Sequence, residues 1–385
     1  MKVTFISNFL SHHQIPFSNE MYKLIGDNYT FVSTIMMEEE RINMGWKIEK
    51  DFLYELKAYE SEKNLEKAYK LSKESDIVII GSAPDLFIKE RLKKNKLTFK
   101  YSERLYKNGL NYKNFIRSMI SAWIHHGKFQ KYPLYMLCAS AYTANDVSIF
   151  RNYKNKTYKW GYFPEFKLYR KEELLRYKEN NIINILWAGR MIDWKEPLDV
   201  IYIANRLNKD GYSFNLNLIG TGYLEKNLRE KVIEYELEDK VNFLGSMKPK
   251  EVRKYMEKSN IYLFTSNFKE GWGAVLNEAM NSGCAIVASH AIGSVPFLLE
   301  HNVNGLIYKY GDLDDLYAKV KFLIDNKDKM IEFGMNAFYT IKENWNAKVA
   351  ANNFLKLSSS LLNKEEVTIN QGPCSKAMII KNDWL

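Results

Sequence analysis

Residues 261–283 read IYLFTSNFKEGWGAVLNEAMNSG, and this stretch has the composition of a β-strand, a loop and an α-helix in succession. The apolar run IYLFT (261–265) predicts a buried strand, and the segment after the glycine turn predicts a helix that ends at Gly283. The start of a helix carries unpaired backbone N–H groups and a partial positive charge, which suit a diphosphate. We therefore expect Glu270 in a ligand-binding loop, and Glu278 on the helix, where its carboxylate can accept hydrogen bonds from a pair of sugar hydroxyls.

Strand-like and helix-like runs alternate on both sides of this stretch, which predicts an α/β fold with mainly parallel sheets. The charged segment 167–181 separates two successive sets of such runs and is interpreted as a linker with some helical content. The sequence thus predicts two Rossmann-like domains whose parallel sheets face each other across a cleft, with ligands at the carboxyl ends of the strands. The first domain is placed at residues 1–170 and the second at 171–345. Residues 346–385 are predicted to be a helix and tail that return toward the first domain.

The strands are expected at definite positions within each domain. In the first they span residues 2–7, 29–34, 76–81, 97–102, 136–141 and 158–163, and in the second residues 183–189, 214–220, 241–245, 261–265, 284–289 and 305–308. The end of the chain, residues 363–385, leaves two interpretations open: a short added strand with a turn, or partial disorder.

The composition is that of a globular chain, since 46% of its 385 residues are hydrophobic and 26% are charged. That length allows two domains of ordinary size. No stretch approaches the roughly 20 apolar residues of a membrane span, and the start of the sequence predicts a first strand and not a signal peptide. Cys138, Cys284 and Cys374 are widely spaced and form no metal-ligand pattern, so we expect a reduced cytoplasmic setting.

Positive charge is concentrated in one part of the chain. Residues 91–170 hold 17 Lys and Arg against 3 Asp and Glu, a net charge of +14, whereas residues 171–385 hold 28 of each. The basic stretch is also rich in aromatic residues, and this combination fits an anionic membrane surface or nucleic acid, or is simply a solvated basic surface. No nucleic-acid recognition motif accompanies it. We therefore expect a peripheral protein at the inner face of a membrane, with no nucleic acid partner.

Three further strand-to-helix loops of the second domain lie where a ligand would be held. Arg190 and Lys195 follow the strand at 183–189, and two cations there can neutralise a diphosphate. A short turn with Gly220 and Gly222 follows the next strand, and Gly245 follows the one after it. None of these features is specific alone, because many such turns need glycine for backbone reasons only.

The order of these loops resembles the C-terminal domain of the family-4 retaining glycosyltransferases of the GT-B fold. The pattern runs Gly-Arg with a Lys five residues on, then Gly-x-Gly, then a loop glycine, then two Glu eight residues apart and a Gly-Ser-x-Pro loop, over about residues 183–345. The resemblance implies that Arg190 and Lys195 contact the donor diphosphate, that Glu270 lies by the transferred sugar, and that Glu278 binds the nucleotide ribose. It also implies a phosphate cradle and its aromatic wall from Gly271, Trp272, Gly273, Ala274 and Val275, in which Trp272 replaces the usual Phe.

The first domain matches that family less well. The loop after its first strand has no glycine, which favours a role in binding the acceptor and places His12, His13 and Gln14 at the end of that strand. His13 is a candidate acid, base or hydrogen-bond donor, although a loop histidine is more often structural. The loop after 97–102 has Ser102, Glu103 and Arg104, in which Glu103 with Arg104 either orients the acceptor hydroxyl or forms a plain ion pair.

The sequence therefore predicts a retaining glycosyltransferase that transfers a sugar from a UDP- or GDP-sugar to a hydroxyl of a saccharide acceptor, such as a lipid-diphosphate-linked polysaccharide. Glu270, Glu103 and His13 are its candidate catalytic residues. Neither a cofactor nor a metal is expected, because no DxD-type acidic pair is present and the cations with a helix start can stabilise the diphosphate. Two alternatives stay open: a nucleotide-sugar 2-epimerase of the same fold, and a non-catalytic transferase-like binding subunit.

Overall fold

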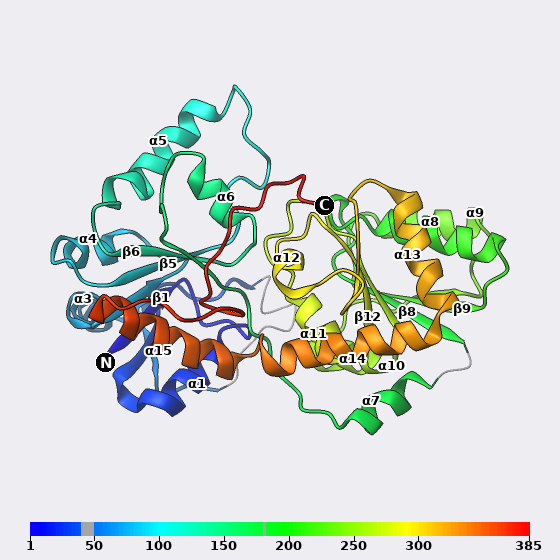
Figure 1. The fold of residues 1–385 in the computed structure, drawn as a ribbon, viewed down its shortest axis with the longest axis horizontal. Helices are drawn as coiled ribbons and strands as arrows, with labels where there is room; N and C mark the ends of the chain where they lie inside the picture. The colour runs from blue at the N-terminus through cyan, green and yellow to red at the C-terminus, as the bar shows by residue number, and fades with distance from the viewer. Residues whose placement is uncertain (40–49, 180–181) are drawn as a thin grey trace. The chain divides into compact units, whose positions relative to one another are not determined.

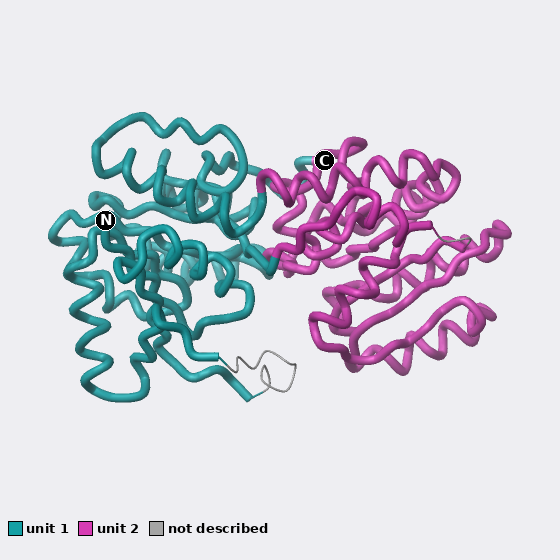
Figure 2. Tube along the Cα trace, turned by 90° about the horizontal axis from the view of Figure 1, so that it is seen from below, with its two compact units in different colours: residues 1–165, 345–384 teal, residues 166–344, 385 magenta. Residues whose placement is uncertain are grey.

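The computed structural model describes residues 1–39, 50–179 and 182–385, and it divides into two compact units. Unit 1 contains Met1–Glu165 together with Trp345–Trp384, and unit 2 contains Phe166–Asn344 with Leu385 (Figure 1, Figure 2). Each unit is built on its own sheet of parallel strands, so the predicted α/β fold with two Rossmann-like parallel sheets is confirmed.

The sheet of unit 1 has seven strands in the order β3-β2-β1-β4-β5-β6-β7. The sequence predicted six of them and missed β3, a three-residue strand with the sequence ELK at the edge of the sheet. So short and polar a segment has no period-two apolar pattern to reveal it. The strands span Val3–Ser7 (β1), Tyr29–Ser33 (β2), Glu55–Lys57 (β3), Ile77–Ile80 (β4), Thr98–Ser102 (β5), Leu134–Cys138 (β6) and Thr157–Lys159 (β7).

The helices of unit 1 include one from the far end of the chain. Helix α15 (Ala347–Asn363) packs against α1 (Ile15–Ile25), and the ring of Phe354 meets those of Phe17, Phe99 and Trp160 at centroid distances of 5.2 to 6.2 Å. The core of unit 1 therefore needs residues from both ends of its sequence. Its other helices are α3 (Glu62–Glu74), α4 (Leu86–Lys93), α5 (Phe115–His125) and α6 (Thr143–Ser148), with 3-10 turns at Gly26–Asn28, Ala58–Glu60 and Gly127–Phe129.

The segment after α15 lies along the edge strand β7. The backbone N–H of Lys159 donates to the carbonyl of Ser375 at 2.7 Å, and that of Cys374 donates to the carbonyl of Lys159 at 2.7 Å. Tyr158 and Lys376 form an antiparallel bridge. Of the two interpretations of the end of the chain, the added strand-like segment is the one the structure supports.

The sheet of unit 2 has six parallel strands in the order β10-β9-β8-β11-β12-β13. All six agree with the predicted positions to within one or two residues at their ends. They span Ile183–Ala188 (β8), Phe214–Ile219 (β9), Val241–Phe243 (β10), Ile261–Phe264 (β11), Ala285–Ser289 (β12) and Leu306–Tyr308 (β13).

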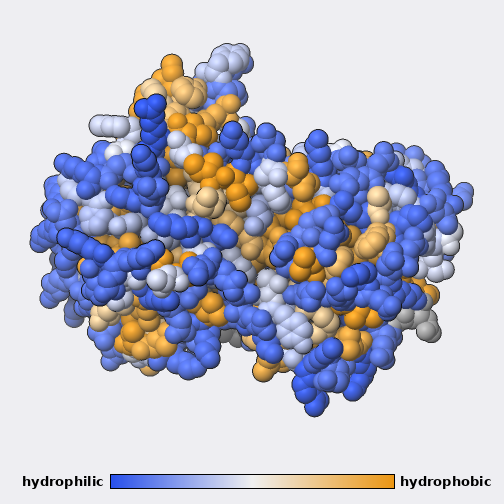
Figure 3. Space-filling view, viewed as in Figure 1, coloured by the Kyte–Doolittle hydropathy of each residue, from blue (hydrophilic) through white to orange (hydrophobic). Residues whose placement is uncertain are grey.

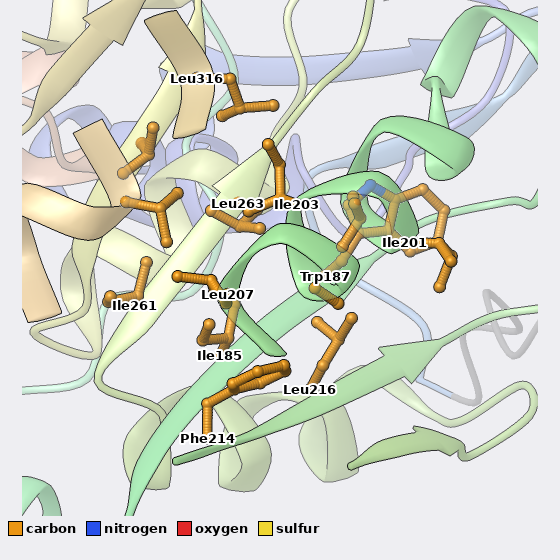
Figure 4. Packing of buried hydrophobic residues seen from close by; sticks show 14 of the residues in the cluster. Ile185, Trp187, Ile201, Ile203, Leu207, Phe214, Leu216, Ile261, Leu263 and Leu316 are labelled. Atoms are coloured by element: carbon orange, nitrogen blue, oxygen red, sulfur yellow. The ribbon is translucent and has the colours of Figure 1, made fainter. Parts of the chain in front are cut away.

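Apolar side chains from these strands and from the helices beside them make the core of unit 2 (Figure 4). Figure 4 shows Ile185 and Trp187 of β8, Leu216 of β9 and Leu263 of β11 among these buried side chains, with Leu207 of α8. The helices are α7 (Lys171–Lys178), α8 (Pro197–Lys209), α9 (Glu225–Glu234), α10 (Pro249–Lys258), α11 (Val275–Asn281), α12 (Val295–Leu298), α13 (Leu313–Asp325) and α14 (Lys327–Glu343), with a 3-10 turn at Asp193–Lys195.

The segment predicted as a linker, 167–181, contains helix α7, and its last two residues, 180 and 181, lie outside the described residues. Among the residues that the structure describes, no helix combines the length and the hydropathy needed to cross a bilayer. Cys138, Cys284 and Cys374 are buried as free thiols.

The order of the strands determines where loops meet. In unit 2 the chain runs from β8 outward through β9 and β10, then returns to place β11 on the other side of β8. Parallel strands end at the same edge of a sheet, so the loops after β8 and β11 emerge side by side at a point where the strand order reverses. Ligands of open α/β sheets bind at such points.

Candidate active site

An ion pair joins the two loops that meet at this point of unit 2. The ammonium group of Lys195, in the loop after β8, contacts Oε2 of Glu270, in the loop after β11. The hydroxyl of Ser266 also donates to Oε2 of Glu270, at 3.0 Å. The Lys195 and Glu270 side chains are only 13% and 10% exposed, so they are partly desolvated and interact strongly. The structure thus brings together two residues that lie 75 positions apart and that the sequence predicted at one site.

Lys195 is held in place by buried polar and aromatic contacts. Its backbone carbonyl accepts a hydrogen bond of 2.8 Å from the Thr265 hydroxyl, which in turn accepts one of 3.0 Å from the indole N–H of Trp187. The ammonium group lies 4.5 Å from the ring centre of Trp194, and the guanidinium of Arg190 lies 5.7 Å from the same ring. Trp194 therefore positions both predicted diphosphate-binding cations. No sequence motif marks Trp194, although it lies between them in the chain.

The glycines of unit 2 let loop backbones approach closely. Gly220 and Gly222 lie against the backbone of the loop after β8, and a methyl group on either would overlap the carbonyl of Gly189 or of Met191. The backbone N–H of Gly220 donates to the carbonyl of Gly245 at 2.8 Å. At these predicted donor-binding residues, the loops after β8, β9 and β10 therefore contact one another through their backbones.

Gly273 has a left-handed backbone, with φ of +83°, and a side chain there would overlap the ring of Phe264. Between Gly271 and Gly273, the side chain of Trp272 is fully buried, and its indole N–H donates to the amide oxygen of Asn277 at 2.9 Å. Trp272 thus fixes the start of α11 from inside the core, so its ring is not an open wall of the site. Ala274 immediately precedes α11, and Val275 is its first residue.

Glu278 on α11 is paired with a residue that the sequence did not suggest. The Arg253 guanidinium on α10 lies 3.7 Å from Oε1 of Glu278, and it donates to the amide oxygen of Asn281 at 2.7 Å. The two charged side chains are 13% and 19% exposed. Arg253 therefore orients the carboxylate that the resemblance assigns to the ribose. It lies among other charged residues of α10, so no local pattern distinguishes it.

Two acidic residues lie beside this site at the start of α8. Glu196 has a left-handed backbone, with φ of +50°, and its Oε1 accepts hydrogen bonds from the Tyr310 hydroxyl at 2.8 Å and the Asn267 side-chain amide at 3.1 Å. Burial, together with the negative charge of Glu196, raises the pKa of Asp199 to about 7. No sequence pattern distinguishes this pair.

Unit 1 has its own cluster at the carboxyl ends of its strands. The rings of His12 and His13 lie 3.8 Å apart, and the His13 ring stacks on Tyr162 at 5.4 Å. The Tyr162 hydroxyl donates to Oε1 of Glu103 at 2.6 Å, and Lys107 binds the other carboxylate oxygen at 2.6 Å. The structure thus brings His12, His13 and Glu103 together through Tyr162, whose role could not be inferred from the turn in which it lies.

Both histidines are uncharged near neutral pH. Burial lowers the pKa of His12 to about 4. Burial, with the neighbouring His12, lowers the pKa of His13 well below its usual value. A neutral imidazole can donate one hydrogen bond and accept another, but the burial that lowers its pKa also makes it a weak base. Of the roles open to His13 at neutral pH, that of a neutral hydrogen-bonding group fits its surroundings.

The other three predicted residues of unit 1 make local or structural contacts. The amide oxygen of Gln14 accepts from the backbone and hydroxyl of Ser11, both at 3.1 Å, and Ser102 donates to the carbonyl of Glu103 at 2.9 Å. Arg104 is buried, and its partners include Asp146 at 3.6 Å, Asn382 at 2.8 Å and the ring of Tyr142 at 4.8 Å. The plain ion pair of Glu103 with Arg104 is therefore replaced by pairs of Glu103 with Lys107 and of Arg104 with Asp146. Across the described parts of the chain, no three His, Cys, Asp or Glu side chains cluster as metal ligands would.

Residues 169–338 match the family described as glycosyl transferases group 1. The amylovoran biosynthesis glycosyltransferase AmsK of Erwinia amylovora is 30% identical over 174 residues, which is 44% of this chain and 42% of AmsK. The putative colanic acid biosynthesis glycosyltransferase WcaL of Escherichia coli is 27% identical over 135 residues, 34% of this chain and 33% of WcaL. The chain thus spans less than half the length of these curated relatives.

A solved structure of Anabaena Alr3699/HepE in complex with UDP resembles nearly the whole chain, covering 94% of this chain and all of that one, with a TM-score of 0.67. Only 15% of the aligned residues are identical, so this likeness shows the fold alone. The fold and the match over residues 169–338 agree on one assignment. Residues 169–338 match the group 1 glycosyltransferases, and the two parallel sheets have the GT-B fold.

Proposed function

We propose that this protein is a retaining glycosyltransferase that transfers a sugar from a UDP- or GDP-sugar to a hydroxyl of a saccharide acceptor during assembly of a surface polysaccharide. Two relatives are named for the biosynthesis of amylovoran and of colanic acid, and a protein of the same fold is known in complex with UDP-glucose. These names support the class of donor and acceptor. Retention of the anomeric configuration follows from the resemblance to family-4 enzymes.

The observation that supports the proposal most is the contact of Lys195 with Glu270 where the loops after β8 and β11 meet. In glycosyl transfer the leaving diphosphate gains negative charge while the anomeric carbon becomes oxocarbenium-like. Lys195 and Arg190 supply positive charge for the first change, and Glu270 supplies a carboxylate for the sugar. When a donor binds, Lys195 exchanges part of its contact with Glu270 for the diphosphate. Glu270 is then free to accept hydrogen bonds from the sugar hydroxyls.

Glu278 serves the other end of the donor. A carboxylate is suited to accept hydrogen bonds from the two ribose hydroxyls, and the 3.7 Å contact with Arg253 limits how far it can turn away. Gly271, Trp272, Gly273, Ala274 and Val275 form the loop and helix start between the two glutamates, where the backbone approaches the diphosphate. Gly220, Gly222 and Gly245 contribute the neighbouring backbone surface.

We assign the acceptor to unit 1. His13 is neutral and can accept a hydrogen bond from the acceptor hydroxyl, while Glu103, fixed between Tyr162 and Lys107, orients that hydroxyl. His12, Gln14 and Arg104 lie in the same two loops, and Ser102 ends β5 just before the second of them. Together they shape the loops around the acceptor. The acceptor is a saccharide linked to a lipid diphosphate, and the reaction takes place at the cytoplasmic face of a membrane. The net charge of +14 on residues 91–170 supports that location.

The test is a thermal-shift screen of the full chain against UDP, GDP and their sugars, followed by product analysis with saccharide acceptors. We expect one nucleotide to raise the midpoint of unfolding for the native chain and to have a smaller effect on Lys195→Ala. The anomeric proton coupling of the product reports retention or inversion. If the donor sugar is epimerised without any acceptor, the protein is a 2-epimerase instead. If a nucleotide binds but no donor is consumed with any acceptor, the binding-subunit alternative replaces the proposal.

A further inference from the structure

Helix α5 presents a broad apolar face to solvent. Its large apolar residues come in pairs every four positions, which places them on one side of a helix. Each of these side chains is between 39% and 65% exposed, and Figure 3 shows hydrophobic atoms gathered over this part of unit 1. An amphipathic helix of a globular protein normally buries its apolar face, whereas α5 exposes it to solvent. The residues are Phe115, Ile116, Met119, Ile120, Trp123 and Ile124.

The inner side of α5 is small and polar. Ala122 is buried, and Ser121, Ala122 and His125 line a cavity of about 550 Å³ in unit 1. His125 shares a hydrogen bond of 2.8 Å with Asp85, and Lys100 donates to its carbonyl at 2.9 Å. These polar contacts hold the helix on unit 1, aided by the packing of Phe115 on Phe150. Most of the apolar face is therefore not needed to attach α5 to its own fold.

Positive charge surrounds this face. Residues 104–145 contain six Lys and Arg and no Asp or Glu. Lys113 precedes the helix, Arg117 lies within it, and Lys128 and Lys131 follow it. Among the described residues, no ion pair joins any of these four to an acidic side chain, and the three lysines each lie over the ring of an adjacent aromatic residue. The apolar face is thus bordered at both ends by cations whose charge is not neutralised within the described chain.

This combination of features distinguishes between possible partners. A second copy of the chain docked about a two-fold axis would bring Arg117 and its neighbouring cations against the same cations, which opposes association. Nucleic acid would attract the cations but would offer nothing apolar to six hydrophobic side chains. An anionic bilayer meets both requirements, because its acyl boundary takes up apolar side chains while its headgroups attract Lys and Arg.

We propose that α5 is the element by which unit 1 binds an anionic lipid surface, lying in the plane of the interface with its apolar face toward the acyl chains. The proposal deepens the proposed function and rests on it for the location of the acceptor, but the binding itself needs no donor or acceptor. It identifies Trp123 and Ile120, the central and highly exposed residues of the face, as inserted groups. Lys113 and Arg117 are identified as headgroup contacts.

The experiment is co-sedimentation of the full chain with vesicles that contain phosphatidylglycerol, and with vesicles of phosphatidylcholine alone. We expect retention on the anionic vesicles that weakens as salt is added. The double variant Ile120→Ser with Trp123→Ser is expected to lose retention at least about tenfold, since it removes two of the inserted side chains. The double variant Lys113→Glu with Arg117→Glu is expected to lose about fivefold or more for each reversed cation.

Matched controls separate the helix from general surface effects. Ile233→Ser removes an exposed isoleucine from α9 of unit 2, and Lys348→Glu with Lys356→Glu reverses the same amount of charge on α15. Both controls should bind vesicles like the native chain. Equal binding by the α5 variants overturns the proposal. So does a change from dimer to monomer in those variants during lipid-free sedimentation, which would identify a second copy as the partner.

Thermal shifts with UDP and GDP are recorded for every variant. α5 variants that keep the nucleotide shift of the native chain but lose the vesicles support the proposal. If neither the native chain nor any variant responds to a nucleotide, the proposed function fails. The membrane proposal still stands if the native chain binds vesicles and the α5 variants do not.

Discussion

Lys195 and Glu270 contact each other across the ends of two adjacent parallel strands, β8 and β11, so a single ion pair connects the first and fourth strands of unit 2 in chain order. Both charges are largely removed from water, and each is the other's principal charged partner. A donor diphosphate would compete with Glu270 for the ammonium group. In the proposed reaction, Lys195 and Glu270 would therefore bind each other in the empty site. With a donor bound, each would contact the donor instead.

Removing one member of this pair leaves the other charge poorly compensated. We expect Lys195→Met and Glu270→Gln each to lower the free energy of unfolding by about 2–4 kcal/mol, and the double variant to lose much less than their sum. Urea unfolding of the four proteins measures the cycle. A double variant whose loss equals the sum would mean that the two side chains do not interact in the folded protein.

Glu270 should matter more for turnover than for affinity. Because its proposed contacts strengthen as the sugar acquires positive charge, Glu270→Gln should lower kcat by about 10²–10³-fold while the Kd for the nucleotide diphosphate changes little. Steady-state kinetics measure kcat, and calorimetric titration measures the Kd. Ser266→Ala, which removes a neighbouring hydrogen bond but no charge, is the control and should have a smaller effect. Full turnover by Glu270→Gln would contradict the assignment.

Glu278 and Arg253 should act as one unit in nucleotide binding. Loss of a charge-assisted contact to the ribose in Glu278→Ala is expected to raise the Kd about ten- to hundredfold. Arg253→Met should give a smaller rise in the same direction, since it removes the group that orients the carboxylate. Arg229→Met on α9, whose guanidinium pairs with Glu225 on the same helix, is the matched control. An unchanged Kd in Glu278→Ala would exclude the ribose contact.

Two glycines with similar backbones should differ in their tolerance of a side chain. Gly273 (φ +83°) faces the ring of Phe264, whereas Gly245 (φ +69°) has open space where a Cβ would lie. Gly245→Ala should cost only the left-handed backbone penalty, about 1–2 kcal/mol. Gly273→Ala adds a steric overlap, so it should lose more stability and weaken donor binding. Thermal unfolding with and without nucleotide compares them, and equal losses would show that Phe264 moves aside freely.

Asp199 should make stability depend on pH. Its pKa is about 7 in the folded protein and ordinary when unfolded, so between about pH 4 and 7 the folded state keeps a proton that the unfolded state has lost. The free energy of unfolding therefore falls as the pH rises through this range, by about 2 kcal/mol after allowance for solvent screening. Asp199→Asn should flatten this dependence in urea titrations, whereas Asp239→Asn, an exposed control, should not. If the free energy of unfolding depends on pH to the same extent in Asp199→Asn, other groups cause the dependence.

The sequence predicted the strands and loops of unit 2 well because each strand is an apolar run or alternates apolar with polar residues, and turn residues follow it. Lys195 and Glu270 could be found because they follow two such strands, and parallel strands end at one edge. Arg253 and Tyr162 could not be found, since their importance depends on which side chains the fold places beside them. The strand Glu55–Lys57 is too short to show a period.

Arg104 shows most clearly what a local sequence pattern cannot predict. The local pattern Ser102-Glu103-Arg104 suggested an acceptor contact, but its guanidinium binds Asn382, 278 positions away, and lies 3.6 Å from Asp146. A local sequence pattern cannot predict a partner so far away in the chain. The neutral state of His13 depends likewise on burial, which follows from the complete fold and not from the loop that carries the histidine.

The packing of Phe354 on Phe17, Phe99 and Trp160 has a consequence for biosynthesis. Helix α15 belongs to unit 1 but is translated after residues 166–344 of unit 2, so a nascent chain of which only Met1–Glu165 has left the ribosome still lacks one side of that core. Unit 2, continuous from Phe166 to Asn344, can fold while the ribosome is still adding the last helix. Unit 1 is therefore begun before unit 2 and completed after it.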